Sequence, residues 1–329
     1  MAEQTHDLLA TVAAMYYLDE MTQNAIADEL GLSRVKVYRL LKQARDEDVV
    51  QIFVNWPQRR DGELEDELAA TFGLDEALVL QANPNAHISS LQMLGQMGAH
   101  FLEERLTAGA TLAICLGRST FEAIQAIRPN FRVHVNVAQA LGSMPSTLGE
   151  LDSAALARQL AQKLGGDVHY LPAPFMAESA ADAAVLRRQR TVAATLDKAR
   201  AADIALLGIG AVAPARSSFV RAGYVTVDEL EAYAAAGVAG DMGGRLFDID
   251  GHARPQEVNA RVIGLTLEDL RAIPLALAIA MGEEKVTAIH GALRTGALNV
   301  LVTDDRTARL VLARQTESRA TVPASLTTV

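Results

Sequence analysis

The chain has 329 residues, more than one hydrophobic core usually holds, so its length predicts two domains. Its formal net charge of −10 argues against a protein that coats nucleic acid or binds an anionic membrane surface. Its apolar runs fall short of the ~20 residues that a membrane-spanning helix needs, and acidic residues precede the first of them, unlike in a secretory signal. Cys115 is the only cysteine, so no internal disulfide can form. We therefore expect a cytoplasmic protein with no membrane partner.

The N-terminal segment predicts three short helices. Apolar residues recur at helical spacing from Leu8 to Leu18. Thr22 can cap a second helix, which Gly31 would end because glycine readily adopts the left-handed conformation found after a helix. Ser33 can cap a third helix, whose apolar face would pack on the second through Val37, Leu40 and Leu41.

The stretch from Gln23 to Lys42 has the residue spacing of a helix-turn-helix. Ala27 is small where two helices must cross, and Gly31 suits the turn between them. The third helix also concentrates positive charge, because no acidic residue occurs from Ser33 to Arg45. We predict that this segment reads double-stranded operator DNA in the major groove, through Gln23, Ser33, Arg34, Lys36, Tyr38, Arg39 and Lys42. The alternative is a solvated basic face on an ordinary helical bundle.

The organisation of the chain follows from the segments beyond this motif. A single helix-turn-helix binds DNA weakly, so we expect two half-sites held by a homo-oligomer. The β-branched run from Val49 to Val54 predicts a strand or wing. Residues 57–62 contain a proline and a glycine, as a linker would. The prediction is a winged helix-turn-helix over residues 1–56, a linker over 57–62 and a second domain over 63–329.

In the second domain, strand-like and helical segments alternate. Helical patterns cover Glu63–Phe72 and Ser89–Leu106, with a short apolar run, Ala77–Leu80, between them. The strand-like runs that follow are Thr111–Leu116, Val133–Ala138, Val168–Leu171, Ile204–Gly208, Leu275–Ala280 and Asn299–Val302. Such alternation implies an α/β domain, with a Rossmann-like parallel sheet and helices on its faces.

Two segments that follow strand-like runs are candidates for anion binding, since an open parallel sheet binds ligands at the carboxyl ends of its strands. The sequence from Gly117 to Thr120 opens a helix, where hydroxyls and free N–H groups suit an anion. A tight turn with a hydroxyl cap is the alternative. Lys285 follows another run, where its ammonium can reach an anionic ligand or simply lie on the surface.

Two glycine-rich segments are less specific. The segment from Gly208 to Gly210 lacks the third glycine of a dinucleotide-binding loop, which argues against nucleotide binding. Residues 240–251 hold Asp241, Asp248 and Asp250 among glycines. These carboxylates could accept hydrogen bonds from sugar hydroxyls or bind a cation, yet a turn rich in glycine and aspartate needs no ligand.

No catalytic or metal-binding constellation is evident in the sequence. The seven histidines are scattered without metal-ligand spacing, and Ser119 is not in a nucleophile elbow. Cys115 lies within an apolar run and is expected to be a core thiol. We therefore expect no enzyme, no cofactor and no metal.

Six segments carry a resemblance to a known family: ADELGLSRVKVYRLLKQARDEDVVQI, ICLGRST, LPAPF, GIGA, AGDMGGRLFDIDG and AMGEEKVTAIHGALRTGALNVLVTDD. In order and spacing they resemble the SorC family of bacterial transcription regulators, over nearly the whole chain. The resemblance implies a winged helix-turn-helix ahead of a domain similar to sugar-phosphate isomerases and deaminases. It also implies a carbohydrate effector and a tetramer, as a dimer of dimers.

The resemblance further implies an effector pocket. Its anion loop would be Gly117, Arg118, Ser119 and Thr120, Asp241 and Lys285 would face the ligand, and Gln139 and Gly142 would line the same pocket. The loop departs from a plainer Gly-x-Thr pattern, and no second basic residue is evident near it. A sugar phosphate, a free sugar and a polyol therefore all stay open as effectors.

These observations predict a ligand-controlled regulator of a carbohydrate or polyol catabolic operon, with repression relieved by the ligand favoured over activation. The alternative is an isomerase or deaminase of sugar phosphates with an added DNA-binding-like extension, for which Asp241 is the candidate base. A scaffold with an inert pocket is a third interpretation.

Overall fold

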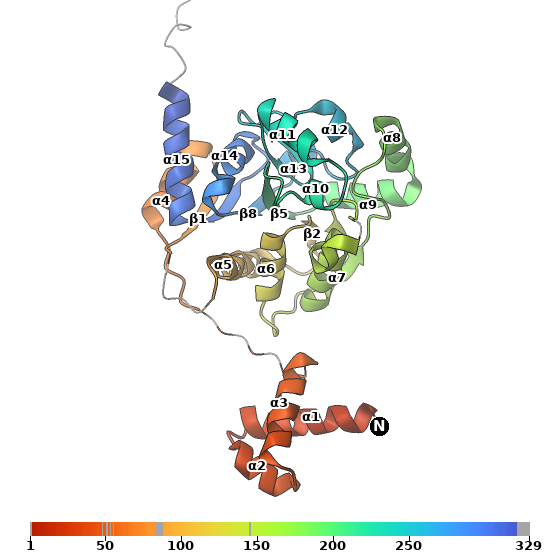
Figure 1. The fold of residues 1–329 in the computed structure, drawn as a ribbon, viewed down its shortest axis with the longest axis vertical. Helices are drawn as coiled ribbons and strands as arrows, with labels where there is room; N and C mark the ends of the chain where they lie inside the picture. Colours follow the sequence, from red (N-terminus) through yellow and green to blue (C-terminus); the bar gives the residue numbers. More distant parts are fainter. Residues whose placement is uncertain are drawn as a thin grey trace, which may run out of the picture. The chain divides into compact units, whose positions relative to one another are not determined.

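The computed structural model describes residues 2–47, 49, 50, 52, 54, 56–82, 88–144 and 146–320. The chain forms two compact units, Met1–Asn55 and Trp56–Val329 (Figure 1). None of the described helices combines the length and the apolar composition that crossing a bilayer takes.

The first unit contains the three predicted helices, α1 (Ala2–Tyr17), α2 (Gln23–Leu30) and α3 (Arg34–Asp46). Apolar side chains from all three pack together, so the unit has a core of its own, which includes Leu9, Val12, Ile26, Val37, Leu40 and Ala44.

The predicted caps of α2 and α3 are confirmed. The Thr22 hydroxyl accepts the Ala25 N–H at 3.2 Å, and Gly31 ends α2 in the left-handed conformation at φ 62°. The Ser33 hydroxyl accepts the Lys36 N–H, also at 3.2 Å. These bonds satisfy backbone donors that a helix start otherwise leaves unpaired, and they fix the turn between the two helices.

The predicted wing is not formed by the described residues of the run Val49–Val54. Val49, Val50, Ile52 and Val54 are in no strand, and residues 51 and 53 lie outside the described residues. The Val50 N–H instead bonds the Ala44 carbonyl at 2.9 Å, and Val49 and Val50 pack against the helical core. This packing accounts for Val49 and Val50, whereas Ile52 and Val54 are exposed.

The second unit includes the whole segment predicted as a linker, residues 57–62. The Asp61 N–H donates to the Val79 carbonyl at 2.9 Å, and the Gln81 N–H to the Arg59 carbonyl at 2.8 Å. The Asp61 carboxylate then caps α4 (Gly62–Phe72). From residue 59 onward the chain is therefore attached to strand β1 (Glu76–Leu80).

The described residues of the second unit form a nine-stranded sheet. Its main path is parallel, in the order β1-β9-β8-β5-β2-β3-β4. The bounds are β2 (Thr111–Ile114), β3 (Asn136–Gln139), β4 (Asp167–His169), β5 (Ile204–Ala211), β8 (Leu275–Ile279) and β9 (Val300–Asp304). Each predicted run overlaps one strand, and the α/β class is confirmed.

A β-hairpin that the sequence did not predict extends from β5. Strand β6 (Val238–Met242) pairs antiparallel with the end of β5 and with β7 (Arg245–Asp248). Gly243 and Gly244 form the turn at φ 56° and 74°. The sequence indicated only a turn here, because glycine and aspartate are depleted in strands. The hairpin places Asp241 directly opposite Gly210 of β5.

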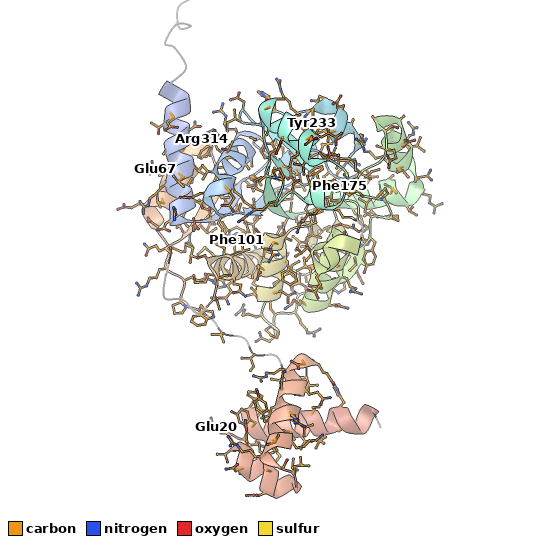
Figure 2. All side chains as sticks on the ribbon, in the orientation of Figure 1. Glu20, Glu67, Phe101, Phe175, Tyr233 and Arg314 are labelled. Atoms are coloured by element: carbon orange, nitrogen blue, oxygen red, sulfur yellow. The ribbon has the colours of Figure 1, made fainter. Side chains whose placement is uncertain are left out.

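Helices cover both faces of the sheet and give it two hydrophobic layers (Figure 1). One layer contains α5 (Ser90–Arg105), α6 (Arg118–Ala126) and α7 (Ser153–Leu164). The other contains α4 together with α8 (Ala180–Arg188), α9 (Arg190–Arg200), α10 (Ser218–Arg221), α11 (Val227–Ala235), α12 (Gln256–Arg261), α13 (Leu267–Arg271), α14 (Val286–Arg294) and α15 (Asp305–Ala320). Phe101 lies in the first layer and Phe175 in the second (Figure 2).

Candidate functional site

Helix α3 presents a cationic face to solvent. Its basic side chains are all exposed, namely Arg34, Lys36, Arg39, Lys42 and Arg45, and none forms an ion pair with another described residue. Tyr38 is 55% exposed among them, while Val37 and Leu40 on the opposite face are buried. Of the other predicted DNA contacts, Ser33 caps the helix and Gln23 opens α2. The charged face is thus free to meet a partner.

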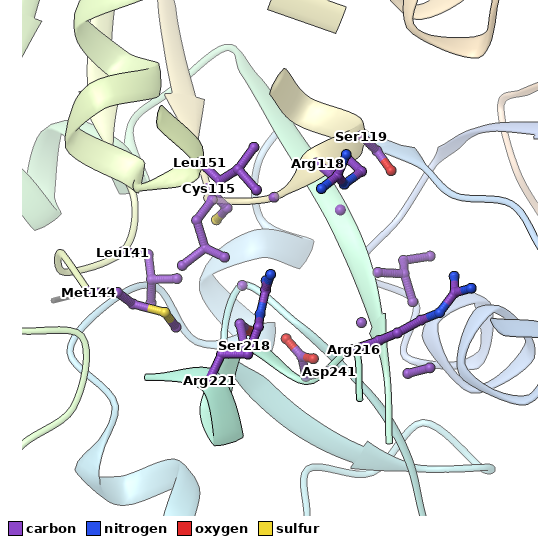
Figure 3. A pocket seen from close by; sticks show the side chains of 18 of the residues that line it. Cys115, Arg118, Ser119, Leu141, Met144, Leu151, Arg216, Ser218, Arg221 and Asp241 are labelled. Carbon is purple, nitrogen blue, oxygen red and sulfur yellow. The ribbon is translucent and has the colours of Figure 1, made fainter. Parts of the chain in front are cut away.

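The second unit has a cavity of about 370 Å³ at the carboxyl ends of β2, β5 and β8. Its lining includes Gly117, Arg118 and Ser119 after β2, Asp241 from the hairpin and Lys285 after β8. Apolar side chains form another part of the wall, among them Leu141, Met144 and Leu151 (Figure 3). Segments far apart in the sequence therefore meet where an open parallel sheet binds its ligands.

The loop before α6 leaves polar groups open beside the cavity. Gly117 precedes the helix at φ 143°, and no side chain caps the first turn. Ser119 lines the cavity. Thr120 is fully buried, and its Oγ1 has no hydrogen-bond partner among the described residues. Open N–H groups at the positive end of a helix, with an unpaired hydroxyl beside them, suit an anionic oxygen.

Asp241 and Lys285 form a charged pair on the cavity wall. The Lys285 Nζ donates to the Ile209 carbonyl at 2.7 Å. Burial raises the pKa of Asp241 to about 6, although the Lys285 ammonium and the Gly244 N–H act in the opposite direction. Burial also lowers the pKa of Lys285, against the attraction of Asp241. The fold therefore holds both groups in surroundings that disfavour their charges.

Two further arginines line the cavity and were missed by the sequence analysis. Arg216 lies in the loop after β5, and Arg221 ends α10 (Figure 3). Arg118 and Arg221 form no ion pair with the rest of the described chain, whereas Arg216 pairs with Glu284. The expectation that no second basic residue lies near the anion loop is thus wrong. No local pattern in the sequence marks these two arginines as cavity residues.

Comparison with known proteins identifies the family. Residues 57–313 match the family described as "Putative sugar-binding domain". The transcriptional regulator LsrR of Klebsiella pneumoniae subsp. pneumoniae is 35% identical over 322 residues, covering 95% of each chain. The crystal structure of the full-length sorbitol operon regulator SorC of Klebsiella pneumoniae aligns with a TM-score of 0.69 at 27% identity, covering 93% of this chain and 99% of that one. The chain belongs to the SorC family.

Membership of the SorC family decides between the functional interpretations. A further relative, the deoxyribonucleoside regulator of Bacillus subtilis, is 29% identical over 312 residues and covers 95% of this chain and 99% of its own. Because such relatives are transcription regulators, this SorC-family chain is a sugar-responsive transcription regulator. The alternative of an isomerase or deaminase is set aside on the same ground.

Two residues assigned to the pocket of this SorC-family chain lie elsewhere. Gln139 is fully buried, and its amide donates to the Leu141 carbonyl, Ser143 and Ser153 while accepting the Leu171 N–H. Both the amide nitrogen and the amide oxygen of Gln139 are thus hydrogen-bonded within the protein, so this side chain does not face the cavity. Gly142 is also outside the lining. A Cβ there would lie 2.2 Å from the Pro174 carbonyl oxygen, so close backbone packing explains that glycine.

The aspartate-rich turn after β7 is closed by its own contacts. Ligand atoms of Asp248, Asp250 and His252 lie within 4.8 Å of one another. However, Asp248 accepts the backbone N–H groups of Asp250 and His252 and pairs with Arg254 at 3.0 Å. Asp250 pairs with Arg294. Cations of the protein already neutralise these carboxylates, so the turn is explained without a ligand.

Cys115 lines the cavity but is only 2% exposed. Burial raises the pKa of its thiol to about 12, and the Asp241 carboxylate adds to the effect. A thiol that stays protonated is a poor nucleophile. Cys115 is therefore part of the packed wall, as the sequence indicated.

Proposed function

We propose that this regulator binds operator DNA through α3 and carries a phosphorylated sugar in the cavity of its second unit, with ligand binding lowering operator affinity. It would then act in the cytoplasm as the repressor of a carbohydrate or polyol catabolic operon. The exposed cationic face of α3 supports the DNA contact, and the cationic cavity supports the ligand class.

The charges around the cavity favour a phosphorylated ligand over a neutral one. The basic side chains that line it are Arg118, Arg216, Arg221 and Lys285, and the carboxylate in the lining is Asp241. Glu284 pairs with Arg216, and Glu122 lies near Arg118. The lining itself therefore carries an excess of positive charge, which suits a phosphate monoester of about −1.5 to −2 at neutral pH. A free polyol would leave this excess unmatched. The sorbitol and deoxyribonucleoside in the names of relatives favour carbohydrates as the class.

DNA recognition would use two copies of α3. Arg34 and Arg39 begin the cationic face, where a recognition helix meets base edges and phosphates. A homo-oligomer would hold two such helices about 34 Å apart, one turn of the duplex. The ligand can alter operator affinity only by as much as it discriminates between the two arrangements of the oligomer.

Operator binding through α3 is tested by measuring the affinity of the full chain for an operator that is selected from a random duplex library. Arg34→Gln with Arg39→Gln should abolish sequence preference. If both side chains contact phosphates in each of the two copies of α3, four contacts are lost and the slope of log affinity against log salt should fall by about 3.6. Arg188→Gln with Arg190→Gln removes the same charge from exposed positions of the second unit and serves as the control. Equal effects of the two pairs would contradict the assignment of α3.

The ligand arm is tested by thermal shift against sugars, polyols and their phosphates. A ligand that binds only the folded state adds about 2.7 kcal/mol of stability at one hundred times its dissociation constant. We expect phosphorylated members to raise the melting temperature and to release the operator. Stabilisation by a neutral polyol alone would contradict the phosphorylated class while leaving the regulator intact.

A further inference from the structure

A carboxylate of the protein already neutralises one of the cations in the cavity. Arg216 lines the cavity from the loop after β5, and its guanidinium pairs with Glu284. Glu284 lies in the 3-10 helix η2 (Glu283–Lys285), one residue before Lys285. The pair thus joins two loops on the carboxyl side of neighbouring strands, β5 and β8.

The backbone turn before η2 lets the Glu284 carboxylate fold back. Gly282 has φ 111°, and a Cβ at that position would lie 2.8 Å from Glu284 Oε2. A side chain there would collide with the carboxylate, and its backbone would be strained. Glycine at 282 therefore keeps open the space that the Glu284 carboxylate occupies beside Arg216.

Resting on the function proposed above, we propose that Glu284 takes the place of the ligand's anionic group at Arg216 and is displaced by it. Glu284 is then a specificity-determining residue. A phosphate has more charge and more acceptor oxygens than a carboxylate and can pair with a guanidinium in a bidentate way, so it competes successfully for Arg216. A neutral hydroxyl does not, so neutral sugars leave the pair closed.

The neighbouring residues hold the turn in place while Glu284 is displaced. The Gly282 N–H donates to the Thr307 Oγ1 at 2.9 Å, and Glu283 pairs with Arg306. Both contacts attach the turn to α15, and neither involves Arg216. Glu283 and Glu284 are thus adjacent exposed glutamates of equal charge, of which only the second faces the cavity cation.

The proposal is tested by calorimetry of the full chain with inorganic phosphate and glucose 6-phosphate, and with glucose as the neutral probe, at constant ionic strength. Glu284→Gln should raise phosphate affinity about two- to fivefold, the range that the loss of one exposed ion pair allows. Glu283→Gln removes the same charge one residue away and should change it less. Arg216→Gln should weaken phosphate binding and abolish the difference made by Glu284→Gln in the double variant.

The outcomes separate this inference from the function it rests on. If Glu283→Gln and Glu284→Gln raise phosphate affinity equally, the effect comes from losing any nearby negative charge. That result would overturn the proposal that Glu284 competes with the ligand for Arg216. Tighter binding of glucose by Glu284→Gln would make the pair a steric gate and would overturn it as well. If neither the wild type nor any variant binds inorganic phosphate or glucose 6-phosphate, the proposed class of phosphorylated ligands is itself wrong.

Discussion

Replacing Asp241 by asparagine tests whether the cavity keeps a charge at the expense of stability. Burial raises the pKa of this carboxyl from its ordinary 3.8 to about 6, despite Lys285 beside it. In the unfolded chain the group ionises at its ordinary pKa. The folded protein must therefore ionise a group whose surroundings disfavour it. At 1.36 kcal/mol per pKa unit, the shift amounts to about 3 kcal/mol of lost stability at neutral pH.

The sign of the effect sets its pH window. A raised pKa means that Asp241 favours folding below its ordinary pKa, and that this contribution is lost as the pH rises through about 6. Asparagine does not titrate, so the free energy of unfolding of the variant does not decrease in this way as the pH rises. We expect the free energy of unfolding of Asp241→Asn to exceed that of wild type by about 1 to 3 kcal/mol at neutral pH, since losing the partner of Lys285 offsets part of the gain.

Urea unfolding of both proteins between about pH 4 and pH 8 measures the difference directly. Asp66→Asn removes the same charge from the exposed face of α4 and is the control. Ligand response should weaken in Asp241→Asn even as stability rises, because functional sites are often kept at a cost to stability. A difference that is constant with pH, or that favours wild type as the pH rises, would refute the account of the buried carboxylate.

Three further changes test other parts of the structure. Gln139→Leu should lower the free energy of unfolding by about 1 to 3 kcal/mol in urea, because it leaves the buried Leu171 N–H without a partner. A loss below about 1 kcal/mol would contradict a structural role. Gly31→Val forces a β-branched residue to φ 62° and should weaken operator binding in anisotropy, with the second unit's ligand affinity as the unaffected control. Ser119→Ala with Thr120→Ala should weaken ligand affinity in calorimetry but leave operator binding unchanged, and an unchanged ligand affinity would remove the anion-loop assignment.

The helix-turn-helix could be predicted because its determinants are local. The caps at Thr22 and Ser33 and the turn at Gly31 involve residues within a few positions of one another, so their spacing in the sequence is also their spacing in the fold. The parallel strands could be predicted because each is a continuous apolar run. The residue order alone also placed the anion loop and Lys285 on one side of the sheet.

The rest of the site depends on tertiary contacts that no local pattern contains. Gln139 follows a strand, as a ligand contact would, but the direction of its side chain is set by Ser153 and Leu171, both remote in sequence. Arg216 and Arg221 line the cavity from the segment after β5, although both lie far from Arg118 in the sequence. The sequence could show that these arginines exist, but not that they face the same space as Arg118.

Several incompletely satisfied groups of the second unit lie at or beside the cavity. Asp241 and Lys285 have pKa values shifted against their charged forms, and Thr120 has a buried hydroxyl without a partner among the described residues. Arg245 is more deeply buried than Lys285, and burial lowers its pKa to about 10. It nevertheless donates to the Leu265, Gly264 and Asn259 carbonyls, so it closes the hairpin without needing a ligand. At the cavity, a bound anion would supply the partners that Thr120, Arg118 and Arg221 lack within the described residues.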